Sequence, residues 1–175
     1  MPKVEVVPYD ENWEHLFEET KKILTDVFGG NLVKVEHFGS TSIPETAAKP
    51  IIDIFVFVRD TSDISKYDNM MRRYGYKPKG VQELTKCFVY EKHDENSGKR
   101  TQKVNVCKED NAFSANALLF RDYLRENKEA CAKYQKLKEE LSQKYPDNLV
   151  AYGNGKLDFI TKTIKEARCR HGKDS

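Results

Sequence analysis

The sequence lacks a long apolar run, so it offers no segment that could cross a membrane. The longest apolar stretch, residues 51–58, has the length of a strand, whereas a membrane-spanning helix needs roughly 20 apolar residues. The first residues also lack the apolar core of a signal peptide. We therefore expect a cytoplasmic protein that does not bind membranes.

Cysteine is scarce, and no two cysteines form a Cys-x-x-Cys unit. The four are irregularly spaced at Cys87, Cys107, Cys131 and Cys169. Zinc knuckles and disulfide frameworks need regular or paired spacings. We interpret all four as free thiols.

A strong excess of charge is also absent. The net charge is +2 over 175 residues, with 33% charged and 38% hydrophobic residues and few Gly or Pro. This composition favours one folded domain over residues 1–175. A dedicated nucleic-acid binder usually carries a basic stripe, so the expected partner is a nucleotide or another phosphorylated small molecule rather than a nucleic acid. The composition leaves the oligomeric state open.

Apolar periodicity predicts a helix followed by two strands in the first third of the chain. Apolar residues recur at helical spacing after Asp10, a candidate N-cap, until Gly29-Gly30. Residues 32–38 then alternate between apolar and polar, as in a half-buried strand. Residues 51–58 are almost all apolar, which is typical of a central strand.

The remaining pattern predicts more strands and a helical tail. A second helix is expected between a cap at Asp60 or Thr61 and a stop at Gly75. Strands are expected at residues 75–78, 84–92 and 99–107, and helices in the last third. The chain therefore indicates an α/β (α+β) fold, with a mixed β-sheet, flanking helices and a helical C-terminal third.

The segment between the first two strands carries the strongest functional signal. The first strand ends in Gly39-Ser40-Thr41, and Lys49 and Asp53 stand at the start of the second. Such a turn can surround a triphosphate with backbone N–H groups and a hydroxyl, while a carboxylate on the next strand holds a metal. An ionised carboxylate in an apolar strand costs several kcal/mol unless it is paired or metal-bound, so Asp53 requires a partner.

Each of these residues also has a purely structural interpretation. Gly39-Ser40 could be an ordinary turn in which glycine supplies a special backbone angle. Asp53 could be a structural carboxylate paired with Lys49 or Arg121, and Lys49 could be a solvated charge.

The helical tail supplies candidate phosphate ligands. Arg121 and Arg125 are four residues apart, so they share a helix face and could clamp a phosphate, with Asp122 opposing Arg125. A surface ion-pair cluster is the alternative. Lys156, expected to project from the last helix, is a further candidate.

Two accessory candidates lie on the first strand. Glu36 and His37 are consecutive, so their side chains point to opposite faces of the sheet. We interpret His37 as a packed or hydrogen-bonded histidine rather than a ligand.

With these motifs in view, the sequence resembles the GrpB-like family of the nucleotidyltransferase superfamily. The resemblance implies a nucleotidyltransferase-like fold and a phosphate site, but no defined reaction. It is carried by Tyr9-Asp10 with Trp13 and Phe17, by residues 36–41 with Pro44, and by residues 48–54, 119–125, Tyr134 with Leu137-Lys138, and Tyr152 with Lys156 and Phe159-Ile160.

The sequence departs from that pattern at the metal ligands. Active nucleotidyltransferases resemble Gly-Ser followed by Asp-x-Asp or Asp-x-Glu, because two divalent ions need several oxygen ligands. Here Phe55 follows Asp53 at the second position, and Lys103-Val104-Asn105 replaces a His-x-His pattern of the family. The family's Pro-Gly-Leu is Pro44-Glu45-Thr46. A compensating carboxylate could come from Glu36, Glu45 or Asp122.

These features indicate a protein that binds a nucleotide or another phosphorylated small molecule, with Mg²⁺ held by Asp53 as the catalytic and metal residue. The reaction would be nucleotidyl transfer, with Ser40 and backbone amides orienting pyrophosphate. Because the carboxylate set is incomplete, we predict weak or no transfer of ordinary triphosphates. The alternative is a non-catalytic ligand-sensing or protein-interaction module, accessory to coenzyme or nucleotide metabolism.

Overall fold

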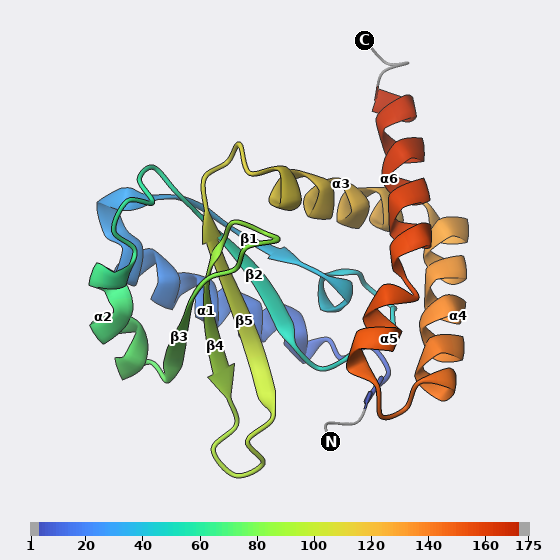
Figure 1. The fold of residues 1–175 in the computed structure, drawn as a ribbon, viewed down its shortest axis with the longest axis horizontal. Helices are drawn as coiled ribbons and strands as arrows, with labels where there is room; N and C mark the ends of the chain where they lie inside the picture. The colour runs from blue at the N-terminus through green and yellow to red at the C-terminus, as the bar shows by residue number, and fades with distance from the viewer. Residues whose placement is uncertain (1–3, 172–175) are drawn as a thin grey trace.

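Five strands form one mixed sheet in the computed structural model, which describes residues 4–171 (Figure 1). The strands are β1 (Leu32–Phe38), β2 (Ile52–Val58), β3 (Tyr76–Val81), β4 (Phe88–His93) and β5 (Arg100–Cys107). Their order in the sheet is β1-β2-β5-β4-β3. Strands β2 and β5 are parallel, whereas the other neighbouring pairs are antiparallel. The predicted mixed sheet is therefore confirmed.

Helices flank this sheet and make up the C-terminal third of the chain, as predicted. Figure 1 shows the last four helices gathered on one side of the sheet, with α2 at the opposite side. None of the helices in residues 4–171 combines the length and the apolar content that crossing a bilayer requires. The helices are α1 (Asn12–Phe28), α2 (Asp68–Arg73), α3 (Ala112–Glu126), α4 (Lys128–Lys144), α5 (Leu149–Asn154) and α6 (Leu157–His171), and the 3-10 segments are η1 (Gly29–Asn31), η2 (Ser40–Ser42) and η3 (Ser65–Tyr67).

Helix α1 packs on one face of the sheet through the apolar residues that recur at helical spacing. Trp13, Phe17 and Leu24 are buried in a core with Ile54 of β2. The helix begins at Asn12, whose backbone N–H donates to the Asp10 carboxylate at 2.9 Å. The predicted helix is confirmed, with Asp10 just outside its first turn.

The opposite face of the sheet is covered over only part of its length. Phe38, Phe55 and Cys107 form a buried cluster against Ala117 and Leu118 of α3. The rings of Phe38 and Phe55 are stacked, with their centroids 3.8 Å apart. Next to this cluster, the same face of the sheet lines a cavity.

The predicted second helix is shorter than expected. Instead of capping a helix, the Asp60 carboxylate accepts hydrogen bonds from the Ser62 backbone N–H and hydroxyl at 2.9 and 2.8 Å. This local turn delays the helix, which starts at Asp68 after η3. The predicted stop is correct, because Gly75 follows the helix with φ +84°.

Candidate ligand-binding site

A cavity of about 540 Å³ lies between the partly covered face of the sheet and helices α3, α5 and α6. Seven residues predicted from the sequence line it together. They are Gly39, Ser40, Thr41, Lys49, Asp53, Arg121 and Lys156. The strand-turn-strand segment therefore converges on one cavity, with Ser40 and Asp53 both exposed to it.

Gly39 allows the turn to approach Asp53. Its backbone has φ +73° and ψ −176°, a conformation that is essentially restricted to glycine. A Cβ atom at this position would lie 2.8 Å from Asp53 Oδ2. The turn is closed locally, because the Ser42 hydroxyl donates to the Gly39 carbonyl at 2.6 Å. The glycine is thus required both by the backbone angle and by the carboxylate beside it.

His37 and Thr41 hold the same turn in place through hydrogen bonds. The Thr41 hydroxyl lies 2.9 Å from His37 Nε2 and donates to the Ile51 carbonyl at 3.2 Å. The His37 ring stacks on Phe17, with centroids 4.8 Å apart. Burial, together with the nearby Arg125 and Arg121 charges, lowers the pKa of His37 to about 3. His37 is therefore a neutral, packed histidine, in agreement with the interpretation from the sequence.

Besides Arg121, four basic side chains line the cavity: Lys49, Lys156, Arg100 and Lys103. Lys49 Nζ and Lys156 Nζ lie 5.7 and 4.6 Å from the centroid of the Tyr152 ring. Arg100 and Lys103 lie on β5. Sequence reasoning missed these last two residues. The signal for Lys103 was its place in Lys103-Val104-Asn105, where the sequence departs from the His-x-His pattern of the resembled family.

The electrostatics of the cavity are dominated by these cations around one carboxylate. Burial raises the pKa of Asp53, and the Lys103, Arg100, Lys49 and Lys156 charges oppose that rise. Burial, assisted by the Lys49 charge, lowers the pKa of Lys156 to about 8. Burial also lowers the pKa of Lys49, against the attraction of Asp53. The group forms an electropositive site that favours an anionic ligand.

The phosphate clamp of Arg121 and Arg125 stays a prediction: Arg121 lines the cavity, but both guanidinium groups are bonded to protein acceptors. Arg121 donates to Glu36 and to the His37 carbonyl at 2.8 Å each, and to Asp122 at 2.7 Å. Arg125 donates two hydrogen bonds to the Ser42 carbonyl, at 3.0 and 2.7 Å, and is not part of the cavity lining. Both guanidinium groups fasten α3 to β1 and the η2 turn, which favours a structural role, with Arg121 buried rather than part of a surface cluster.

These contacts also occupy two of the three carboxylates that could have compensated for the missing metal ligands. Glu36 and Asp122 are paired with Arg121. Phe55, at the position of a second carboxylate, is fully buried. Asn105 is buried as well, and its Nδ2 atom donates to the Ile54 carbonyl at 3.4 Å.

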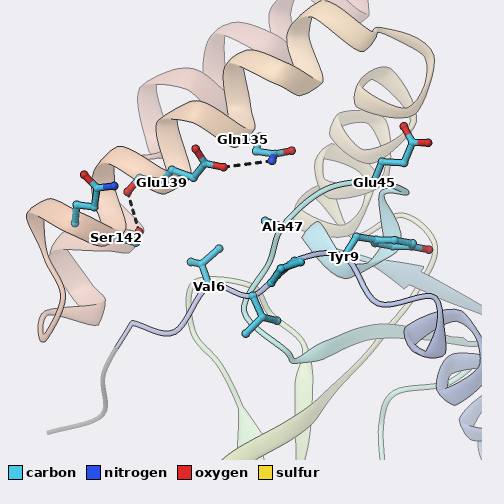
Figure 2. Close-up of a pocket in the computed structure, with 10 residues that line it drawn as sticks. Val6, Tyr9, Glu45, Ala47, Gln135, Glu139 and Ser142 are labelled. Atoms are coloured by element: carbon cyan, nitrogen blue, oxygen red, sulfur yellow. Dashed lines mark hydrogen bonds between the residues drawn. The ribbon is translucent and has the colours of Figure 1, made fainter.

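The third carboxylate, Glu45, lines a different cavity. This groove of about 440 Å³ lies between the N-terminal segment and α4 (Figure 2). Among the residues that the structure describes, its lining includes Glu45 and Glu139 and no basic side chain, so it does not suit a phosphate. Glu45 adopts φ +59°, a left-handed conformation that favours glycine.

The donor set for a metal ion is therefore small. Within residues 4–171, no group of three or more His, Cys, Asp or Glu side chains is placed to hold a metal. Asp53 is the single carboxylate among the described residues that line the cavity. The Mg²⁺ expected from the sequence stays a prediction, and this donor set does not fit a resident ion.

Comparison with known proteins assigns the chain to a family. The family model described as GrpB protein matches residues 3–166, and the chain belongs to the GrpB family. The chain is 39% identical over 164 residues to UPF0157 protein YqkA of Bacillus subtilis. That match covers 94% of this chain and 47% of YqkA, so the chain spans about half the length of that relative.

Solved structures support both the family and the broader fold class. The GrpB protein from Enterococcus faecalis is 36% identical and superposes with a TM-score of 0.86, covering 95% of this chain and 99% of that protein. Terminal uridylyl transferase 4 from Trypanosoma brucei, solved with bound dUTP, superposes with a TM-score of 0.56 at 12% identity. It is covered over 56% of its length, and this chain over 94%. The chain thus has a nucleotidyltransferase-like fold.

Proposed function

We propose that the cavity binds a nucleotide or another phosphorylated small molecule. The observation that carries this proposal is the convergence of Lys49, Lys103 and Lys156 on the cavity formed by the Gly39-Ser40 turn. Among the described residues, none of these three lysines lies within 4 Å of a carboxylate oxygen. Their charges are therefore available to phosphate oxygens, which lysine binds as a point charge.

The rest of the cavity suits the organic part of such a ligand. Phe113 and Phe120 of α3 and Ile160 and Ile164 of α6 supply apolar wall. The volume lies within the range of roughly 300–1,000 Å³ that is usual for small-molecule sites. Because a uridylyl transferase of the same fold was solved with dUTP, nucleoside triphosphates are the first ligands to test.

Binding without efficient catalysis is the second part of the proposal. Nucleotidyl transfer with two metal ions draws on several carboxylates, and Phe55 and Asn105 occupy the positions that would supply them. This observation favours the non-catalytic ligand-sensing role over the transferase role. A Mg²⁺ ion that enters the cavity bound to the phosphates would find one carboxylate ligand, Asp53, among the described lining residues.

A thermal-shift screen tests the proposal directly. Nucleoside mono-, di- and triphosphates and inorganic tripolyphosphate are added to the purified protein with excess Mg²⁺ or with EDTA. Binding to the native state raises the free energy of unfolding by about 2.7 kcal/mol at a hundredfold excess over the dissociation constant. A Lys49→Ala, Lys156→Ala double variant should lose the shift, whereas Lys162→Ala, an exposed position on α6, should retain it. A flat screen for all phosphorylated compounds would contradict the proposal.

Pyrophosphate release provides the separate test of catalysis. We expect little or none from nucleoside triphosphates in the presence of Mg²⁺ and a panel of hydroxyl acceptors. Robust release that disappears in Asp53→Asn would show that the protein is an active transferase.

A further inference from the structure

The parallel pairing of β2 and β5 places a lysine where a metal-dependent site would need another oxygen ligand. In the register of these strands, Asp53 lies directly across from Lys103. Residues paired in this way project from the same face of a sheet. Both line the cavity, so an ammonium group and the carboxylate share its floor.

The charges at this floor do not suit a divalent cation. Mg²⁺ requires near-octahedral oxygen coordination and is usually bound through one or two carboxylates together with substrate phosphates. Here one carboxylate, Asp53, faces the charges of Lys103, Arg100, Lys49 and Lys156. A divalent cation bound beside Asp53 would be repelled by the three lysines, none of which is within 4 Å of a carboxylate oxygen among the described residues.

Lys103 differs from Arg100, the other cation of β5 that lines the cavity, in what holds it. Arg100 is paired with Glu91, so its charge is already compensated. Lys103 Nζ donates to the neutral side-chain amide of Gln82, at 3.3 Å. A neutral acceptor positions the ammonium group without cancelling its charge. The group can therefore compensate the charge of a ligand.

We propose that Lys103 takes the part that a divalent metal ion plays in metal-dependent sites of this fold. Its ammonium group neutralises the ligand's phosphate charge, together with Lys49 and Lys156, which line the same cavity. Binding of a nucleoside triphosphate is then independent of divalent metal. This inference rests on the proposed function, because it concerns the same cavity and ligand class.

Isothermal titration calorimetry with ATP, UTP and inorganic tripolyphosphate, in excess EDTA or excess Mg²⁺, tests the inference. We expect the wild-type protein to bind at least one of these probes in EDTA. Its dissociation constant should change by less than about threefold when Mg²⁺ is added, which is under about 0.7 kcal/mol. Lys103→Ala should weaken binding in EDTA by about tenfold or more, or about 1.4 kcal/mol.

Two further substitutions of Lys103, with one control variant, separate a charge-compensating role of this lysine from a structural one. Lys103→Arg keeps the positive charge and should retain binding in EDTA. Lys103→Asp places a second carboxylate across from Asp53 and should make binding depend on Mg²⁺. Lys77→Ala, which removes an exposed lysine of β3 outside the cavity lining, should leave affinity and metal independence unchanged. Urea unfolding of each variant identifies any loss of binding that comes from loss of fold.

Asp53→Asn distinguishes the two kinds of site by the sign of its effect. If lysines hold the phosphates, removing the carboxylate charge retains or strengthens binding in EDTA. If a metal ion holds the phosphates, the same variant loses the binding that is measured in excess Mg²⁺.

The results distinguish the failure of this inference from the failure of the proposed function. Wild-type binding that requires Mg²⁺ would overturn the inference while the proposed function stands. A folded Lys103→Ala variant that binds in EDTA as tightly as the wild type would also overturn it. If the wild type binds no probe in either condition, both are wrong.

Discussion

Two consecutive residue pairs on one face of β2 and β5 have opposite surroundings. Asp53 lies across from Lys103, and Phe55 lies across from Asn105. The first pair, the open pair, lines the cavity. The second, the sealed pair, is packed away from solvent, with Phe55 0% and Asn105 1% exposed.

The difference shows how packing limits the chemistry of the site. Two residues along a strand span only about 7 Å, yet this step leads from an open charged cavity into an aromatic cluster. Phe55 stacks on Phe38 and lies near Phe113. A carboxylate at position 55 would be buried among these rings. The protein therefore keeps a nucleotidyltransferase-like fold, but this face of β2 accommodates a carboxylate at position 53 and not at position 55.

The largest expected effect comes from forcing a charge into the sealed pair. Phe55→Asp should lower the free energy of unfolding by more than the roughly 3–5 kcal/mol typical of Phe→Ala, because it also buries a carboxylate. Urea unfolding followed by circular dichroism measures the loss. Phe55→Leu, the control, should cost only about 1–1.5 kcal/mol. A stable Phe55→Asp variant with new Mg²⁺ affinity would contradict this prediction, because it would show that the sealed pair can also hold a carboxylate.

Arg121 fastens the helix that seals the second pair, so its removal should act on stability. Arg121→Gln leaves Glu36 and the His37 carbonyl without their shared donor. Breaking a buried pair costs about 3–5 kcal/mol, and the 30% exposure of the Glu36 side chain reduces our expectation to about 2–3 kcal/mol.

Arg125→Gln is the matched variant, and it should cost about 1 kcal/mol for its hydrogen bonds to one carbonyl. Denaturant titration compares the two. If Arg121→Gln kept its stability but lost phosphate affinity, the phosphate clamp predicted from the sequence would be supported.

Gly39→Ala tests the close contact that defines the open pair. Its conformation costs a residue with a Cβ about 1–3 kcal/mol, and the new methyl group would displace the Asp53 carboxylate. Gly98→Ala shares the positive φ, +66°, but its Cβ would meet no atom within 4 Å. The difference in unfolding free energy between the two variants reports the Asp53 contact. Equal losses would show that Asp53 is not held against this turn.

The smallest expected effect is on the pH dependence of binding in the open pair's cavity. Lys156 has a pKa of about 8 in the free protein, so its charge is present below that pH and is lost above it. Affinity for tripolyphosphate should therefore fall as the pH rises from 7 to 9, by at most about tenfold per pH unit. Lys156→Arg should remove most of this fall, because a guanidinium group stays protonated. An identical pH profile in the wild type and in Lys156→Arg would show that Lys156 does not contact the ligand.

Much of the fold followed from local pattern. Apolar residues at helical spacing predict α1, and Trp13 and Phe17 are buried as that spacing requires. Alternation and continuous apolar content predict β1 and β2. The second helix was overestimated, because Asp60 caps a local turn whose hydrogen bonds no periodicity reveals.

The sequence by itself determined most of the elements, including the Gly39-Ser40 turn and the strand that carries Asp53, since backbone angles and apolar periodicity act over a few neighbouring residues. Only the tertiary structure decided the partners of the charges. Lys103 faces Asp53 because two strands far apart in the chain pair in parallel register. Arg121 turns to Glu36 because α3 packs beside β1. Electrostatic interactions depend on distance in space, and that distance is set by packing between elements rather than by spacing along the chain.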